Sequence, residues 1–226
     1  MLNYDDYDAV IFDCDGVILD SNNMKISAMG SALSAAGYPA THIPCAISYF
    51  KNNFGKNRFH HVNYFVSDLL GSALPEGTDS ENLKTEIISA YAEAVEQEYM
   101  EVAEADGVRN LLASWFARSD LYIASGSEQE QLQRVMKARN LDDFFIDILG
   151  SPASKVDNVR KIINKGYKNV LFIGDAVADM QAAFDNGIDF VFYSPYSNVK
   201  SEMMELSEKF KFLEISDYQV LYDRTA

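Results

Sequence analysis

The sequence has little cysteine, with only Cys14 and Cys45 among 226 residues. Two thiols cannot form the dense disulfide framework of a small secreted protein, and free cysteines are typical of a reducing compartment. The cysteines and the three histidines also do not occur at the spacing of a zinc site. These absences exclude a disulfide scaffold and a Cys/His metal centre.

Positive charge is also scarce, since 19 Lys and Arg face 34 Asp and Glu, for a net charge of −15. This balance argues against nucleic acid and anionic membrane surfaces as partners. No stretch approaches the roughly 18 apolar residues that a membrane span needs. The acidic N-terminus also has no apolar run after a basic start, as a signal peptide would. We therefore expect a cytoplasmic protein.

Residues 21–105 have a helical pattern throughout. We expect helices at 21–36, 45–53 and 58–70, and a fourth one after residue 80. A capping-box pattern at 78–81 predicts the start of the fourth helix, in which Ile88, Tyr91, Val95, Tyr99 and Val102 recur at helical spacing. Helices with short connections and no strand signal predict a small bundle.

From Gly107 onward, strands and helices alternate. Apolar runs predict strands at 121–124, 145–149, 170–173 and 189–193, and a second capping-box pattern at 127–130 predicts a helix start. With the run at 10–12, this alternation predicts an α/β fold with a parallel sheet covered by helices on both faces. The sheet domain is expected at 1–20 and 106–226, with the bundle at 21–105 inserted; we assign residues 209–226 no role.

Two acids follow the first apolar run directly, as Asp13 and Asp15, with Gly16 behind them. If strand geometry persists, both side chains point to the same side, where they repel each other unless a cation compensates. Carboxylate oxygens suit Mg²⁺. On its own, this pattern is equally compatible with a surface loop carrying two solvated acids.

Polar residues follow the other predicted strands as well. Ser125 and Gly126 follow one strand, Lys155 lies in the first turn of a later helix, and Asp175 and Asp179 follow the strand at 170–173. The helix dipole disfavours a cation at the Lys155 position, so an anion nearby is a fair inference. Each residue alone could be an ordinary loop or cap residue. Their order at the carboxyl ends of parallel strands, where ligands bind in such sheets, favours a site.

These four segments resemble the four motifs of the haloacid dehalogenase-like (HAD) hydrolase superfamily. Asp13-Cys14-Asp15-Gly16 is similar to motif one, Ser125-Gly126 to motif two, Lys155 to motif three and Gly174–Asp179 to motif four. The chain most resembles the phosphoglycolate phosphatase and β-phosphoglucomutase-like branch. The resemblance implies a Rossmann-like core with a helical cap at 21–105.

The resemblance also implies a Mg²⁺-dependent phosphatase that hydrolyses a small phosphorylated metabolite, with a sugar phosphate as one candidate. Asp13 would attack phosphorus, and Asp15 would act as acid and then as base. We expect the charge of Asp13 to raise the pKa of Asp15. Asp13, the Asp15 carbonyl and Asp175 would bind Mg²⁺.

In the same scheme Ser125, Lys155 and the backbone near Gly126 would hold the phosphate. Asp179 would orient Lys155 or a metal-bound water. Arg58, in a G-x-x-R segment that begins at Gly55, would contact the substrate anion; the alternative is a solvated helix end.

The remaining expectations concern two histidines, one cysteine and the alternative functions. His60 and His61 are expected at the surface or in packing, and Cys14 in packing. The sequence leaves two other functions open, a phosphomutase of the β-phosphoglucomutase type and a catalytically idle HAD-like binding module.

Overall fold

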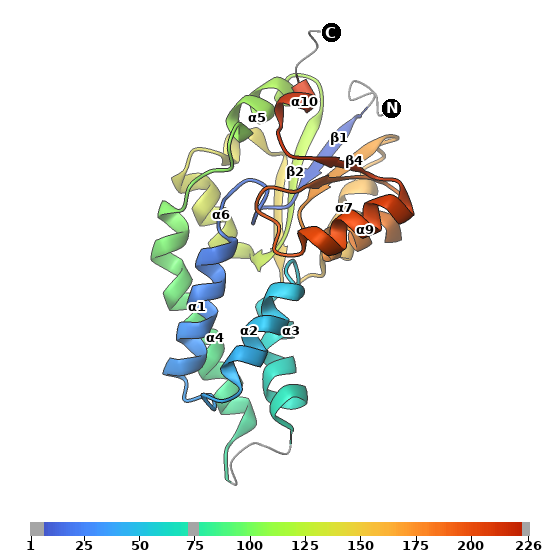
Figure 1. Cartoon of the computed structure of the whole chain (residues 1–226). Helices are drawn as coiled ribbons and strands as arrows, with labels where there is room; N and C mark the ends of the chain where they lie inside the picture. The colour runs from blue at the N-terminus through green and yellow to red at the C-terminus, as the bar shows by residue number, and fades with distance from the viewer. Residues whose placement is uncertain (1–6, 72–76, 223–226) are drawn as a thin grey trace.

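A computed structural model describes residues 7–71 and 77–222. Its centre is a six-stranded, wholly parallel, Rossmann-like sheet with strand order β3-β2-β1-β4-β5-β6 (Figure 1). The strands are β1 (Ala9–Phe12), β2 (Asp120–Glu128), β3 (Asp147–Ser151), β4 (Val170–Gly174), β5 (Asp189–Tyr193) and β6 (Leu213–Ile215). The predicted α/β class is confirmed.

Helices cover both faces of the sheet. One face packs against α5 (Val108–Phe116), α6 (Gln129–Ala138) and α10 (Gln219–Tyr222), and the other against α7 (Lys155–Ile163), α8 (Val177–Asp185) and α9 (Lys200–Phe210) (Figure 1). Alternate residues of β1 enter the two cores, Val10 and Phe12 on one face and Ala9 and Ile11 on the other. A strand buried on both faces is apolar at every position, which is why these strands were recognisable as continuous apolar runs.

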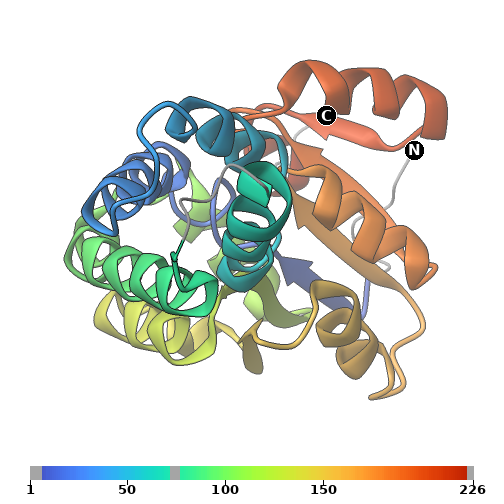
Figure 2. The same cartoon turned by 90° about the horizontal axis from the view of Figure 1, so that it is seen from below.

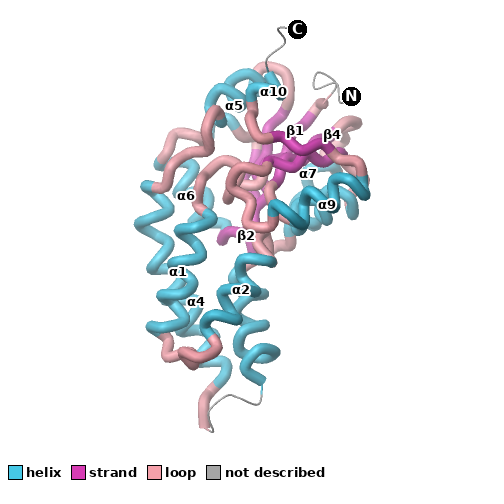
Figure 3. The backbone as a smooth tube through the Cα atoms, viewed as in Figure 1, coloured by secondary structure: helices cyan, strands magenta, loops and turns pink. Residues whose placement is uncertain are grey.

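A helical bundle extends from the carboxyl edge of the sheet, as the secondary-structure view shows (Figure 3). It consists of α1 (Asn22–Ala35), α2 (Ile43–Asn52), α3 (Arg58–Asn63), the π-helix η2 (Tyr64–Leu70) and α4 (Ser80–Glu101). The view from below shows α1 and α4 side by side (Figure 2). The buried face of α4 carries Leu83, Ile87, Tyr91, Val95 and Tyr99.

The chain enters and leaves the bundle through one short crossing, residues 18–20 and 103–105, which we call the neck. The Asp20 amide donates to the Ala103 carbonyl at 2.9 Å, and the Ala105 amide donates to the Ile18 carbonyl at 2.9 Å. These two antiparallel bonds hold the ends of the bundle segment next to each other.

Four local predictions were wrong in detail. Asp79, not Thr78, caps α4, and Glu128, not Ser127, caps α6. The strand predicted at 145–149 is β3 at 147–151, because a 3₁₀ turn at 142–144 precedes it and Ile146 is 58% exposed. The second half of the predicted 58–70 helix is the π-helix.

Residues 209–222, to which the sequence analysis assigned no role, form part of the fold. Within 209–222, β6 extends the sheet, and Tyr218 stacks on Tyr193 with ring centroids 4.0 Å apart. The Tyr218 hydroxyl also donates to the Val17 carbonyl at 2.7 Å. Within the described ranges, no helix combines the length and the apolar character needed to cross a bilayer.

Candidate active site

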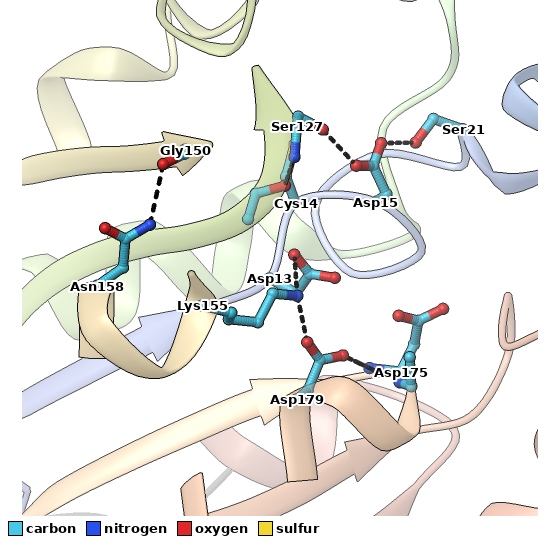
Figure 4. A network of polar contacts seen from close by, with 12 residues as sticks. Asp13, Cys14, Asp15, Ser21, Ser127, Gly150, Lys155, Asn158, Asp175 and Asp179 are labelled. Carbon is cyan, nitrogen blue, oxygen red and sulfur yellow. Dashed lines mark hydrogen bonds and ion pairs between the residues drawn. The ribbon is translucent and has the colours of Figure 1, made fainter. Parts of the chain in front are cut away.

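Four side chains from three parts of the chain meet at the carboxyl edge of the sheet. Asp13 follows β1, Lys155 begins α7, Asp175 follows β4, and Asp179 lies in the first turn of α8 (Figure 4). All four are buried, and one carboxylate oxygen from each of the three acids lies within 4.8 Å of the other two. The structure thus brings together the strand-end residues that the sequence analysis selected.

Lys155 is the cation at the centre of this cluster. Its ammonium lies 3.0 Å from Asp13 Oδ1 and is bonded to Asp179 Oδ1. Burial lowers the pKa of Lys155, but the Asp13 and Asp179 carboxylates raise it more, so Lys155 stays charged. The other oxygen of Asp179 accepts from the Asp175 amide at 3.0 Å and the Ala176 amide at 2.9 Å. Asp179 therefore fixes both Lys155 and the loop that carries Asp175.

The two remaining acids of the cluster resist ionisation. Burial, followed by the charge of Asp179, raises the pKa of Asp13 to about 7 and also raises the pKa of Asp175. Asp175 Oδ2 accepts from Asn22 at 2.8 Å, whereas the buried Oδ1 has no hydrogen-bond partner. An unpaired carboxylate oxygen beside two further buried acids fits the oxygen ligand set of Mg²⁺. These residues could therefore hold a divalent metal ion.

Asp15 does not join this carboxylate cluster, although it is only two residues from Asp13. Its side chain is directed toward Ser127 and Ser21, away from Lys155 (Figure 4). β1 ends at Phe12, so the strand alternation that predicted a shared direction does not reach Asp15.

The predicted rise in the pKa of Asp15 is also wrong. Burial raises the pKa of Asp15. The Lys25 ammonium, 2.6 Å from Asp15 Oδ2, and the hydrogen bonds from Ser21 and Ser127 lower it by more, so the net shift is downward. Lys25 is a cation that the spacing of the acids could not indicate.

Ser125 and Gly126 line the cavity above Asp13, at the carboxyl end of β2. Ser125 is buried, and its hydroxyl accepts from the Ser127 amide at 3.1 Å. The loop at 53–57 closes over this point, because a Cβ on Gly126 would lie only 2.6 Å from the Gly55 carbonyl oxygen. The cavity measures about 30 Å³, enough for a water molecule but not for a phosphate ester.

Arg58 also lines this cavity and is only 8% exposed. Its guanidinium donates to Gln131 at 2.6 Å and lies 5.2 Å from the centroid of the Tyr91 ring. Among the described residues it has no carboxylate partner. Burial rules out the alternative of a solvated helix end.

His61 is buried and His60 exposed, in keeping with the packing and surface positions expected of them. The His61 ring packs against Phe50 with centroids 4.6 Å apart, and burial lowers its pKa to about 3, so the ring is neutral. Cys14 is buried and lies 3.3 Å from the Tyr99 hydroxyl.

The sequence analysis missed five polar residues that contact the site: Ser21, Asn22, Lys25, Tyr99 and Ser127. Asn22 and Lys25 both point inward from the first turn of α1, three residues apart. Two polar residues at helical spacing, on the helix face that also carries the buried apolar residues, could have indicated that they belong to a site. Ser127 was instead assigned to a helix cap.

Comparison with known proteins gives one consistent result. The haloacid dehalogenase-like hydrolase family model matches residues 7–187. No curated protein sequence matches the chain.

Solved structures share the fold over nearly the whole chain. A "predicted phosphatase" from Clostridium acetobutylicum superposes with a TM-score of 0.73 at 20% identity, over 95% of this chain and 96% of that one. A haloacid dehalogenase-like family protein from Streptococcus pneumoniae gives 0.71 at 18% identity, over 96% and 97%. CbbY from Rhodobacter sphaeroides, solved with xylulose-1,5-bisphosphate, gives 0.65 at 15% identity, over 84% and 88%.

Proposed function

Since this chain belongs to the haloacid dehalogenase-like hydrolase family, we propose that it is a Mg²⁺-dependent phosphatase acting on a small phosphate monoester. The observation that carries the proposal is the buried pair of Asp13 and Lys155, 3.0 Å apart, next to Asp175 and Asp179. A carboxylate nucleophile, a fixed cation and two further metal-type ligands are the parts that phosphoryl transfer requires.

The reaction would proceed in two displacements at phosphorus. In the first, Asp13 Oδ attacks phosphorus, the bond to the ester oxygen breaks, and that oxygen takes a proton from Asp15. This releases the alcohol and leaves an aspartyl-phosphate. Asp15 would have to be protonated when the ester binds; Lys25 lowers its pKa, and the negative charge of the bound ester would raise it. In the second, a water oxygen attacks phosphorus, Asp15 takes its proton, and the bond to Asp13 breaks to release inorganic phosphate.

Mg²⁺ would be held by Asp13, Asp175 and the main-chain carbonyl of Asp15, with Asp179 close by. When bound, it would offset the charge of the buried acids and of the phosphate oxygens. The hydroxyl of Ser125, the amide of Gly126 and the ammonium of Lys155 would hold the phosphate oxygens. They are rigid donors in a buried site, where such interactions stabilise developing charge most strongly.

The helical bundle at 21–105 would act as a cap over the sheet domain at 1–20 and 106–226. Because the cavity of about 30 Å³ cannot admit a phosphate ester, the bundle must move away from the sheet for substrate to enter. Arg58, buried in the cavity wall without a carboxylate partner in the described chain, would bind a second anionic group of the substrate.

The test is phosphate release from p-nitrophenyl phosphate with Mg²⁺ and again with EDTA, followed by a panel of phosphorylated metabolites that includes bisphosphates. We expect release that requires Mg²⁺ and is lost in Asp13→Asn. No release from any ester, or equal release by Asp13→Asn, would contradict the proposal and favour an idle binding module. Transfer of phosphate to a second position of the substrate instead of to water would identify a phosphomutase.

A further inference from the structure

The Asp175 carboxylate has fewer contacts than those of the other two acids in the cluster. Asp13 and Asp179 both contact the Lys155 ammonium, and Asp179 also accepts from two main-chain amides. Asp175 is buried beside them and, among the described residues, has no ion-pair partner (Figure 4). In the same part of the chain, its Oδ2 accepts one side-chain hydrogen bond, from Asn22 Nδ2 at 2.8 Å, and its Oδ1 accepts none. Asn22 therefore sets the orientation of this carboxylate.

The amide group of Asn22 is itself held in one orientation. Its Nδ2 donates a second hydrogen bond, to the Tyr196 carbonyl at 3.0 Å, so both amide protons are used. A main-chain carbonyl can only accept, so the amide cannot flip without losing this bond. Gly16 lies directly against the pair, since a Cβ there would lie 2.5 Å from Asn22 Nδ2 and would also overlap Asp175 Oδ2. The donor is thus fixed on Asp175 from two sides.

The main chain of Asp175 is held separately from its side chain. The Ser197 hydroxyl donates to the Asp175 carbonyl at 2.6 Å, and the Asp175 amide donates to Asp179 at 3.0 Å. Neither bond involves Asn22, which is the first residue of α1 and belongs to the bundle segment. Loss of the Asn22 amide would therefore leave the loop after β4 in place and free the carboxylate alone.

Stability of the fold gives little reason for an asparagine at this position. Asn22 is only 1% exposed, and its Oδ1 has no hydrogen-bond partner in the described chain. A buried acceptor without a donor is unfavourable for the folded state, and alanine forms a helix more readily than asparagine does. The residue is therefore best explained by what its Nδ2 does for Asp175.

We propose that Asn22 is a positioning residue for the metal site, where its amide holds one oxygen of Asp175 and leaves the other free for a divalent cation. The inference rests on the proposed Mg²⁺-dependent function. Carboxylates that bind metals are oriented by hydrogen bonds from neighbouring residues, and loss of such a partner costs about 10- to 100-fold in metal affinity. Without Asn22, the Asp175 carboxylate can rotate, so the site loses affinity for Mg²⁺ although all of its ligands remain.

The experiment measures Mg²⁺ binding to the whole chain by isothermal titration calorimetry with MgCl₂, in the absence of substrate. We expect Asn22→Ala to raise the Kd for Mg²⁺ about 10- to 100-fold. Asn23→Ala, the same change at the next and exposed residue of α1, is the matched control and should keep the wild-type Kd. Release of phosphate from p-nitrophenyl phosphate should follow binding. Asn22→Ala should need more Mg²⁺ for half-maximal activity by the same factor, with kcat at saturating Mg²⁺ close to that of wild type.

Thermal melts in EDTA separate positioning from packing. We expect both variants to unfold near the wild-type temperature when no metal is bound. A lower Tm for Asn22→Ala together with an unchanged Kd would mean that Asn22 serves packing alone, and an unchanged Kd at any Tm would overturn the positioning role.

A measurement on the wild-type protein covers the case in which Asn22→Ala does not fold. In its NMR spectrum, Mg²⁺ should shift the side-chain amide resonances of Asn22 and leave those of the exposed Asn23 in place. The absence of a shift at Asn22 would overturn the inference as well. If wild-type protein binds no Mg²⁺ at all, the failure lies with the proposed function instead.

Discussion

Asp13 and Asp15 are two residues apart, yet their pKa values move in opposite directions. Burial raises the pKa of Asp13 to about 7, with the charge of Asp179 adding to it. Asp15 is just as deeply buried, but Lys25 and neighbouring hydroxyl groups lower its pKa below the usual value. The same residue type at one strand end therefore has two environments, and the difference comes from side chains elsewhere in the chain.

The raised pKa of Asp13 makes the stability of the metal-free protein depend on pH. Asp13 keeps a proton up to about pH 7 when folded but only to about pH 4 when unfolded, so its contribution to stability falls as pH rises from 4 to 7. Asp13→Asn removes this contribution. We compare the free energy of unfolding of the variant with that of wild type at pH 5 and at pH 8. The difference should move in favour of the variant by on the order of 1 kcal/mol or more between these pH values, since one pKa unit corresponds to about 1.4 kcal/mol.

The measurement is urea unfolding in EDTA at the two pH values. Asp68→Asn, on an exposed position of the π-helix, is the control and should follow wild type at both. If the Asp13→Asn variant instead lost stability relative to wild type between pH 5 and pH 8, the pKa of Asp13 in the folded chain would not be raised.

Arg58 should determine selectivity more than rate. Hydrogen bonds to a charged group contribute about 1.5–3 kcal/mol, or roughly 10- to 150-fold in affinity. We expect Arg58→Gln to raise KM at least tenfold for a bisphosphate and to leave KM for p-nitrophenyl phosphate nearly unchanged. Steady-state kinetics on the two substrates measures this, and an equal rise in both values would place Arg58 in packing alone.

How well a residue could be predicted depended on whether its role follows from its position in an element. Asp13, Lys155 and Asp175 were predictable because parallel strands bring their carboxyl ends to one edge. Lys25 was not, because a lysine in a helix is normally solvated, and this one is buried by contacts with Asp15, Ser127 and the Tyr99 ring of α4. Ser127 was misassigned because its sequence pattern also fits a helix cap.

The loop at 53–57 is the element that closes the cavity, and it depends on the absence of a side chain at Gly126. A Cβ there would lie 2.6 Å from the Gly55 carbonyl oxygen and 2.9 Å from that of Lys56. We expect Gly126→Ala to push the loop outward and to lower kcat/KM at least tenfold, because the loop then no longer closes over the phosphate-binding groups.

Gly30→Ala in α1 is the matched control. Its new Cβ would meet only Ile47, at 3.8 Å. Because alanine favours a helix over glycine by about 0.8–1 kcal/mol, this variant should gain stability and keep full activity. Steady-state kinetics and thermal unfolding of both variants make the comparison; full activity in Gly126→Ala would mean that the loop need not close.

Among the elements, the strands β4 and β5 were the easiest to predict. The runs at 170–173 and 189–193 match β4 and β5, because a strand buried on both faces has no polar interruption. β3 was placed two residues early, since Phe145 and Ile146 continue the apolar run before the strand begins. The π-helix has no period that distinguishes it in the sequence from the α-helix before it.

For the whole molecule, metal binding should appear as stability. A ligand that binds only the folded chain stabilises it by about 2.7 kcal/mol at 100 times its Kd. We expect Mg²⁺ to raise the Tm and EDTA to reverse the rise. Asp175→Asn should lose the effect, whereas Asp15→Asn should keep it, because Asp15 would contribute only its main-chain carbonyl. Thermal melts with and without Mg²⁺ measure this; a full response in Asp175→Asn would contradict the assignment.

The overall charge of −15 contrasts with the interior of the site. The cavity wall carries Lys25, Lys56 and Arg58, and Lys155 pairs with Asp13, another residue of that wall. These four cations lie beside the four carboxylates Asp13, Asp15, Asp175 and Asp179, so the site is close to balanced in charge although the sequence has a net charge of −15.

The neck described above has an evolutionary consequence. Because residues 18–20 and 103–105 are hydrogen-bonded neighbours, the segment between them is joined covalently to the sheet domain at one place. Recombination at that point can exchange one set of helices for another of different length without shifting a strand of the sheet. The chemistry at the strand ends can therefore be inherited unchanged while the choice of metabolite diversifies.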